Sequence, residues 1–303
     1  MSSHSYIKND KNADIFININ GTLVHRSEAK ISVFDSGFLL GDGVWEGIRL
    51  HKNKLVFIDD HLDRLFESAK GISLNISLTK EEIINEISKV LVKNNMEDDV
   101  HIRLIISRGE KITPYQNPNA NLGPMSLVII PEFKKTDPKT YKDGITIGRV
   151  STIRPSHNIL STHFNTLSKL NCILASIEAN KYGYDEGIMN DLHGNISTCN
   201  STNLFFIKNN SVLTSKGEYC LNGITRSKAI YLCETNDIDC YQKDFTFDEI
   251  KDCDEAFVTG TFAGLIPVST IENRKLSSIN SNSLTNRIRD LYNHHIQENI
   301  NKA

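Results

Sequence analysis

The stretch Ile31–Arg49 reads ISVFDSGFLLGDGVWEGIR, and the expected fold of the first half of the chain is built outward from it. Its first residues, 31–34, are mostly apolar and predict a short strand. A segment with four glycines follows. Residues 48–50 (Ile-Arg-Leu) and the apolar residues 55–58 flank a polar turn, which predicts a β-hairpin.

On both sides of this stretch, the first half is predicted to combine strands with two helices. Residues 14–20 alternate apolar and polar side chains and lead through a Gly-Thr turn into a Leu-Val pair, which predicts another hairpin. Asp60 is the expected N-cap of a helix with one apolar face. The segment 79–82 has the composition of a helix cap, and strands are predicted at 101–107 and 126–131.

The whole chain is predicted to be an α+β protein of two lobes. Residues 133–144 (FKKTDPKTYKDG) lack apolar periodicity and hold a proline and a closing Asp-Gly, so they are expected to link a small N-terminal lobe, 1–133, to a large C-terminal lobe, 134–303. A helix at about 167–182 places four apolar residues on one face. The other elements expected in this lobe are strands at 145–150, 187–189, 204–207, 212–213 and 255–258 and helices at 226–234 and 283–299.

The composition argues against several classes of partner. The 303 residues carry 34 basic and 37 acidic side chains, a formal net charge of −3, so neither nucleic acid nor an anionic membrane is expected to bind. No apolar run approaches the ~18 residues of a membrane span. The six cysteines lack the spacing of a metal site, which predicts reduced thiols in a cytoplasmic protein without a metal.

Three features of the sequence suit an anion. Thr225 lies just before a predicted helix, where backbone N–H groups and a hydroxyl fit a phosphate, although an ordinary N-cap is the alternative. Thr259-Gly260-Thr261 follows a predicted strand and either holds phosphate oxygens or forms a plain turn. Arg64, on a helix with apolar neighbours, either binds a phosphate bidentately or pairs with a nearby aspartate.

Taken together, in order and spacing, the motifs of the chain resemble the class IV (fold type IV) aminotransferases from about residue 14 to 272. That family includes branched-chain and D-amino-acid aminotransferases, R-selective amine transaminases and aminodeoxychorismate lyases. The resemblance implies a two-lobed fold with pyridoxal 5′-phosphate or pyridoxamine 5′-phosphate between the lobes, a small-molecule substrate and a homodimer. The motifs are IFININGTLV (15–24), ISVFDSGFLLGDGVWEGIR (31–49), DDHLDRLFESA (59–69), NLFFI (203–207), LNGITR (221–226) and EAFVTGTFAGLIPV (255–268).

The resemblance also assigns the residues that hold the cofactor phosphate. Arg64 matches the phosphate-binding arginine, and one phosphate would be shared between it and residues of the second lobe. Ile224 and Thr225 match backbone and hydroxyl donors, and Thr261 matches a further phosphate contact. The apolar residues implied to line the substrate pocket are Phe38, Leu40 and Trp45.

Two positions that activate the cofactor in this family are changed. Ungapped alignment on Glu178-Ala179 places Asn165 at the position of the Schiff-base lysine, and an amide cannot form that covalent bond. Thr198 stands where the family has the glutamate that keeps the pyridine nitrogen protonated, and a hydroxyl supplies no negative charge. The cofactor is therefore expected either to bind without a covalent bond or to use another lysine.

Lys169 and Arg108 are the candidate substitutes for groups that the family normally places elsewhere. Lys169 follows Asn165 by four residues, and its stem of ~6 Å matches the ~5.4 Å pitch of one helical turn, so it is placed to reach back toward the cofactor. A solvated helix lysine is the alternative. The loop 113–116 lacks the arginine and histidine that some members use for the substrate carboxylate, and Arg108 is the nearby substitute.

Two functions are consistent with this sequence. The first is a transaminase-like enzyme that transfers an amino group between an amino acid or amine and a keto acid. The second is a diverged homologue without lysine-dependent catalysis. That homologue would bind the cofactor or another phosphorylated ligand non-covalently, for a different reaction or a non-catalytic role. The sequence leaves both open, and the retained phosphate motifs are common to both.

Overall fold

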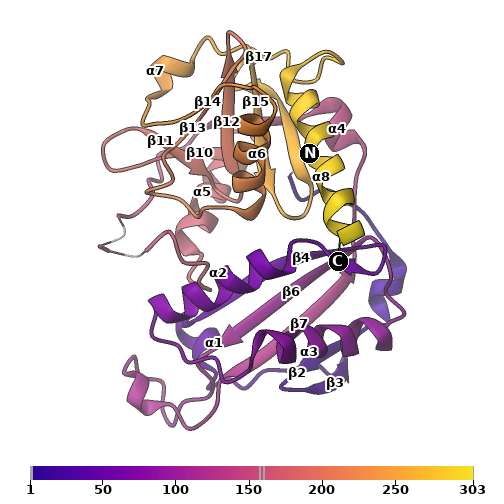
Figure 1. Ribbon diagram of the computed structural model, residues 1–303. Helices are drawn as coiled ribbons and strands as arrows, with labels where there is room; N and C mark the ends of the chain where they lie inside the picture. The colour runs from indigo at the N-terminus through magenta and orange to yellow at the C-terminus, as the bar shows by residue number, and fades with distance from the viewer. Residues whose placement is uncertain (1–2, 157, 160, 303) are drawn as a thin grey trace. The chain divides into compact units, whose positions relative to one another are not determined.

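A computed structural model describes residues 3–156, 158–159 and 161–302, and the chain divides into two compact units (Figure 1). The N-terminal unit consists of 7–135 together with 164–169. The C-terminal unit consists of the other described residues. The strands at which the chain passes between the units are β1 (Tyr6–Ile7) and β8 (Lys135–Thr136).

The N-terminal unit is built on a six-stranded sheet with the strand order β3-β2-β7-β6-β4-β5. Every neighbouring pair is antiparallel, and the two predicted hairpins, β2 with β3 and β4 with β5, are confirmed. The elements of this unit are η1 (Asp10–Ala13), β2 (Phe16–Ile19), β3 (Thr22–His25), α1 (Ser36–Leu40), β4 (Gly43–His51), β5 (Lys54–Leu55), α2 (Ile58–Gly71), α3 (Lys80–Lys93), β6 (Val100–Ser107), η2 (Pro118–Ala120) and β7 (Ser126–Phe133).

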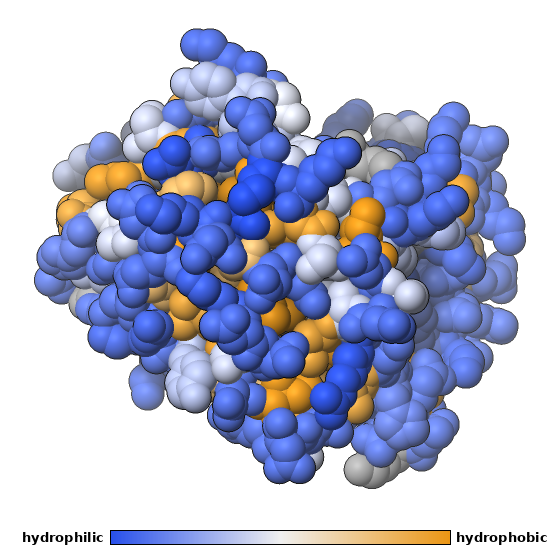
Figure 2. Space-filling view, turned by 90° about the horizontal axis from the view of Figure 1, so that it is seen from above, coloured by the Kyte–Doolittle hydropathy of each residue, from blue (hydrophilic) through white to orange (hydrophobic). Residues whose placement is uncertain are grey.

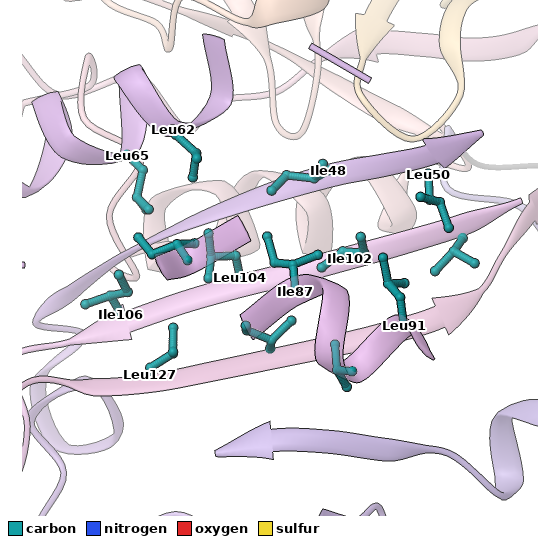
Figure 3. Close-up of a cluster of buried hydrophobic side chains, with 14 of the residues drawn as sticks. Ile48, Leu50, Leu62, Leu65, Ile87, Leu91, Ile102, Leu104, Ile106 and Leu127 are labelled. Atoms are coloured by element: carbon teal, nitrogen blue, oxygen red, sulfur yellow. The ribbon is translucent and has the colours of Figure 1, made fainter. Parts of the chain in front are cut away.

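Helices α2 and α3 pack their apolar faces on one face of this sheet (Figure 3). Because alternate strand residues point to opposite faces, β4, β6 and β7 each contribute every second side chain to this core. The buried core side chains labelled in the figure come from α2 (Leu62, Leu65), α3 (Ile87, Leu91), β4 (Ile48, Leu50), β6 (Ile102, Leu104, Ile106) and β7 (Leu127).

The helix starts in this unit follow their capping chemistry, with two differences from expectation. The capping box at Thr79 is confirmed, since Thr79 and Glu82 bond each other's backbone N–H groups. The N-cap prediction for Asp60 is wrong. Phe57, at φ 50°, begins the helix, and Asp60 falls in its first turn. The strand predicted at 31–34 is also absent, because Asp35 instead caps the short helix α1.

The C-terminal unit contains a nine-stranded mixed sheet. Its order is β11-β10-β9-β16-β15-β12-β13-β14, and β17 also pairs with β16. Helix α5 packs on β9 and β10, whereas α6 and α8 pack on each other and on β15. The elements are α4 (Lys139–Asp143), β9 (Ile145–Arg149), α5 (Leu170–Lys181), β10 (Glu186–Asn190), β11 (Ile196–Cys199), β12 (Asn203–Lys208), β13 (Ser211–Thr214), α6 (Ile224–Thr235), β14 (Cys240–Gln242), α7 (Phe247–Ile250), β15 (Glu255–Gly260), β16 (Gly264–Ile271), β17 (Arg274–Lys275) and α8 (Leu284–Lys302).

Helix α5 begins three residues later than its periodicity predicts. Thr166 forms an antiparallel bridge with Val44, and the Leu167 N–H donates to the carbonyl of Gly43 at 2.9 Å, so this segment is tied to β4 before the helix starts. The helix packs inward through alanines. The four apolar residues predicted on one face are 49–67% exposed: Leu170, Ile173, Leu174 and Ile177.

The surface seen from above is mainly hydrophilic, with apolar residues showing between the polar ones (Figure 2). Among the helices formed by the described residues, none combines the length and the apolar character needed to span a membrane.

Candidate functional site

The start of helix α6 lies in a tight setting within the C-terminal unit. Gly223 is the N-cap and has no side chain with which to bond the first-turn N–H groups. A Cβ at this position would lie 2.4 Å from the Asn203 side-chain oxygen, so only glycine fits. The N-cap alternative for Thr225 is wrong, because Thr225 lies inside the first turn. The donors of this turn therefore need a partner other than a capping side chain.

Hydroxyl groups surround this helix start. Thr225 is 3% exposed, and its Oγ1 lies 3.4 Å from the hydroxyl of Tyr292 on α8. Asn203, next to Gly223, pairs with Thr259 of β15. The buried Thr259 Oγ1 has no hydrogen-bond partner among the described residues, and Thr261 lies two residues further along. A polar oxygen group could satisfy that hydroxyl, which makes this region a candidate phosphate site.

Thr198 faces a different environment in the same unit. It is buried on β11, and its hydroxyl donates to the carbonyl of Thr202 at 2.8 Å. Nearby, Glu186 receives hydrogen bonds from hydroxyls, including Thr202 Oγ1 at 2.6 Å, and burial raises the pKa of this carboxyl. Because the Thr198 hydrogen is already donated within the chain, this side chain offers a ligand only an acceptor.

Arg64 belongs to a buried ion pair in the N-terminal unit, and its pairing partner is not one of the nearby aspartates. Its Nε and Nη2 donate to the two oxygens of Glu46 at 2.8 and 2.7 Å, and His61 Nδ1 lies 2.7 Å from Glu46 Oε2. Burial alone would raise the Glu46 pKa. The Arg64 guanidinium and the hydrogen bonds from His61 and Arg64 outweigh it and hold the pKa below its usual value. This two-point pair fixes the direction of the Arg64 guanidinium.

Asn165 lies at the centre of a closed set of hydrogen bonds in the N-terminal unit. It is 1% exposed, and its side-chain Nδ2 donates to the Trp45 carbonyl at 2.7 Å. Its own carbonyl accepts the Trp45 N–H at 3.0 Å, and its N–H donates to Ser68 Oγ at 3.0 Å. The segment 164–169 is thereby fixed against β4 and α2.

Lys169 does reach back to Asn165. Its Nζ donates to Asn165 Oδ1 at 3.1 Å and lies 5.5 Å from the centre of the Trp45 ring. The surrounding segment is not helical, because α5 begins only at residue 170. The structure therefore brings together three residues that the sequence singled out: Asn165, Lys169 and Trp45.

The remaining predicted pocket residues have different environments. Phe38 and Leu40 on α1 are 68% and 41% exposed. Arg108 is held by the chain itself. Its Nε and Nη2 donate to the two carboxylate oxygens of Asp42, and its Nη1 and Nη2 donate to the carbonyls of Ser73 and Ile72. The Arg108 guanidinium thus links Asp42 to the main chain at residues 72 and 73.

Sequence reasoning missed several of these residues. Glu46 lies in GVWEGIR at a position whose period-2 pattern predicts an inward side chain, and an inward carboxylate is a signal for a buried partner. Ser68, Thr259 and Tyr292 carry no such signal, because only tertiary pairing gives them their neighbours. The structure adds them to the candidate site.

Comparisons with known proteins identify the family of the chain. Residues 43–271 match the family model described as "Amino-transferase class IV". The chain therefore belongs to the class IV aminotransferase family. A solved T.th. branched-chain amino acid aminotransferase with pyridoxamine 5′-phosphate superposes with a TM-score of 0.86 at 26% identity, covering 94% of this chain and 95% of that chain.

Two curated relatives carry the names of branched-chain aminotransferases. The chain is 37% identical over 284 residues to branched-chain-amino-acid aminotransferase-like protein 2 of Arabidopsis thaliana, which covers 93% of this chain and 50% of that protein. It is 34% identical over 278 residues to a putative branched-chain-amino-acid aminotransferase of Methanocaldococcus jannaschii, covering 91% and 94%. The chain thus spans about half the length of its Arabidopsis relative.

Proposed function

We propose that this protein is an aminotransferase that uses pyridoxal or pyridoxamine 5′-phosphate to move an amino group from an amino acid or amine to a keto acid. When bound, this cofactor carries the amino group between the two small-molecule substrates. The family membership supports the proposal, as does a relative of the same fold solved with pyridoxamine 5′-phosphate. The branched-chain names of the relatives favour an aliphatic amino acid as substrate.

The C-terminal unit fits the phosphate end of the cofactor. Backbone N–H groups of Ile224 and Thr225, with the Thr225 and Thr261 hydroxyls, are the proposed phosphate donors. The positive end of the α6 dipole favours an anion there. The Thr259 hydroxyl, which has no partner within the described part of the chain, supports an oxygen-rich ligand next to them. Arg64 is proposed as a further phosphate contact, kept in orientation by its pair with Glu46.

The residues expected to meet the aldehyde and the pyridine nitrogen of the cofactor do not fit these two groups in the way usual for the family. Asn165 cannot bond covalently to an aldehyde, and its amide is already engaged with Trp45 and Lys169. Thr198 gives its hydrogen to Thr202, so it accepts a hydrogen bond but supplies no charge. The cofactor is therefore proposed to keep its phosphate anchor, while Lys169 takes over the role of the family's lysine.

The single observation that carries this assignment is the 3.1 Å contact between Lys169 Nζ and Asn165 Oδ1. It places an amine at the side chain that occupies the family's lysine position. In its neutral form, this amine can accept a proton from a substrate carbon and return it at a neighbouring atom. Trp45, Phe38 and Leu40 are the proposed apolar lining that holds the substrate and excludes water.

Borohydride reduction tests the assignment. The protein is incubated with pyridoxal phosphate and reduced, and the labelled peptide is mapped by mass spectrometry. We expect the label on Lys169 and its loss in Lys169→Met. Lys181→Met, at the exposed C-terminal end of α5, is the matched control and keeps the label. Bound cofactor without any labelled lysine would contradict the assignment and favour the alternative of non-covalent binding without lysine chemistry.

We also propose that the protein forms a homodimer through α5. Its residues Leu170, Ile173, Leu174 and Ile177 repeat at i, i+3, i+4 and i+7 and are 49–67% exposed, an apolar stripe that burial in a partner would stabilise. The expected mass by light scattering is twice 34.1 kDa. Leu174→Glu should give the monomer. Val92→Glu, a change of a singly exposed valine on α3, should not.

The cytoplasm is the proposed location, because all six cysteines are free thiols and a reducing compartment keeps them so.

A further inference from the structure

Asn165 has each of its polar groups committed to a named partner. The backbone N–H donates to Ser68 Oγ, the backbone carbonyl accepts from the Trp45 N–H, and Nδ2 donates to the Trp45 carbonyl at 2.7 Å. The remaining group, Oδ1, accepts from Lys169 Nζ at 3.1 Å. An amide that is 1% exposed and fully bonded has little freedom to rotate.

The orientation of this amide follows from the hydrogen-bond chemistry. If the amide were turned over, its oxygen would face the Trp45 carbonyl oxygen at 2.7 Å, and its NH2 group would face the amine of Lys169. The contact with the Trp45 carbonyl would then lack a donor, and the contact with a protonated Lys169 would lack an acceptor. The main chain of Trp45 therefore dictates that the Asn165 oxygen points toward Lys169.

The acceptor that Asn165 offers to the Lys169 amine is neutral. A carboxylate at the same distance would attract the ammonium form and hold the lysine charged. An amide oxygen orients Nζ through one hydrogen bond without adding a negative charge. The Trp45 ring, 5.5 Å away, adds an apolar surface on which the lysine is held. This arrangement directs the amine toward the Asn165 oxygen and the Trp45 ring.

We propose that Asn165 is a positioning residue for Lys169, and that Trp45 orients the Asn165 amide through its main chain. The residue assigned to the family's lysine position thus sets the direction of the lysine proposed to replace it. This inference rests on the proposed aminotransferase function and adds the residue that makes a displaced lysine usable.

Competitive labelling of the full-length protein, without added cofactor, tests the inference. Trace acetic anhydride modifies neutral amines, and mass spectrometry gives the labelling of Lys169 relative to the exposed Lys181 at each pH. In Asn165→Asp, the Lys169 profile should move to higher pH by about one unit, roughly a tenfold loss of labelling at a fixed pH below the new midpoint. Asn165→Leu, which removes the acceptor, should move the Lys169 profile to lower pH, because the hydrogen bond to the amide oxygen favours the ammonium form.

Ser168→Ala is the matched control, because Ser168 lies in the same segment and bonds Gly41 instead of Lys169. Its Lys169 profile should match that of the wild-type protein. Profiles that coincide in all four proteins would overturn the inference, since a merely structural Asn165 would alter stability but not the titration of Lys169. Because no cofactor is present, this result is independent of the borohydride test, whose failure would overturn the proposed bond between Lys169 and the cofactor instead.

Discussion

The start of α6 in the C-terminal unit and the segment 164–169 in the N-terminal unit treat their polar groups in opposite ways. At α6, glycine replaces a capping side chain, and the adjacent Thr259 hydroxyl has no partner among the described residues. At 164–169, Asn165 has all of its polar groups bonded to Ser68, Trp45 and Lys169.

This difference separates two kinds of functional structure. A region whose hydrogen-bond donors lack partners within the fold is suited to bind a ligand, because a ligand oxygen can accept those hydrogen bonds. A region that satisfies itself is suited to hold a side chain in one direction. The first property suits the proposed phosphate site, and the second suits the proposed role of Lys169.

The largest expected effect comes from breaking the buried ion pair between Glu46 and Arg64 in the N-terminal unit. Glu46→Gln leaves Arg64 and His61 without their buried carboxylate, which should cost about 3–5 kcal/mol of unfolding free energy at pH 7. The Glu46 pKa is lowered in the folded protein. Its contribution is thus present above the unfolded-state pKa of 4.5 and is lost as pH falls through the folded value. Urea unfolding at pH 7 and at pH 4 or below measures the change.

Glu186→Gln is the matched control for that variant. Burial raises the Glu186 pKa, so the unfolded chain loses this proton first, and wild-type stability falls as pH rises from 4.5 toward the folded value. The variant should therefore gain on the wild type with rising pH, the reverse of Glu46→Gln. Equal pH dependence in the two variants would contradict the assigned directions.

A smaller effect, on cofactor binding, is expected from adding a side chain at the start of α6. Gly223→Ala brings a Cβ to 2.4 Å from Asn203 Oδ1, so the helix start or Asn203 must shift. Pyridoxamine phosphate should bind about a hundredfold more weakly by calorimetry, equivalent to about 2.7 kcal/mol. Gly123→Ala, where a Cβ meets no atom within 4 Å, should bind normally. Unchanged affinity in Gly223→Ala would remove α6 from the phosphate site.

The smallest effect concerns one hydrogen bond of the self-satisfied segment. Ser68→Ala removes the acceptor of the Asn165 N–H and should lower the unfolding free energy by about 1 kcal/mol. Ser88→Ala, which loses only a hydroxyl bond on the exposed side of α3, should be nearly neutral. A neutral Ser68→Ala would show that the segment 164–169 does not need this anchor.

Much of the fold could be predicted because its signals are local. The capping box of Thr79, the period-2 strands β2, β6 and β7, and the apolar face of α2 all depend on neighbouring residues. The failures have a common cause. Residues 31–34 are apolar enough for a strand, but Asp35 caps a helix directly after them and the segment has no sheet neighbour among the described residues.

The candidate site divides in the same way. The motif around Arg64 in one unit, and those around Thr225 and Thr261 in the other, can be recognised from the sequence because each is a short run of adjacent residues. The side chains that contact those residues cannot be recognised from the sequence. Glu46 meets Arg64 only because β4 and α2 pack together, and Thr259 stands beside Gly223 only through Asn203 of another strand.

The sequence by itself determined the family, and it predicted two changed activating positions and Lys169 as the candidate replacement. All of these depend on residue identity and spacing along the chain. Tertiary structure alone decided that Lys169 bonds Asn165 and that Trp45 fixes the amide between them. The physical reason is that the bridge between Thr166 and Val44 ends the extended segment just before α5. Pairing across more than a hundred residues, and not helical periodicity, sets where the lysine points.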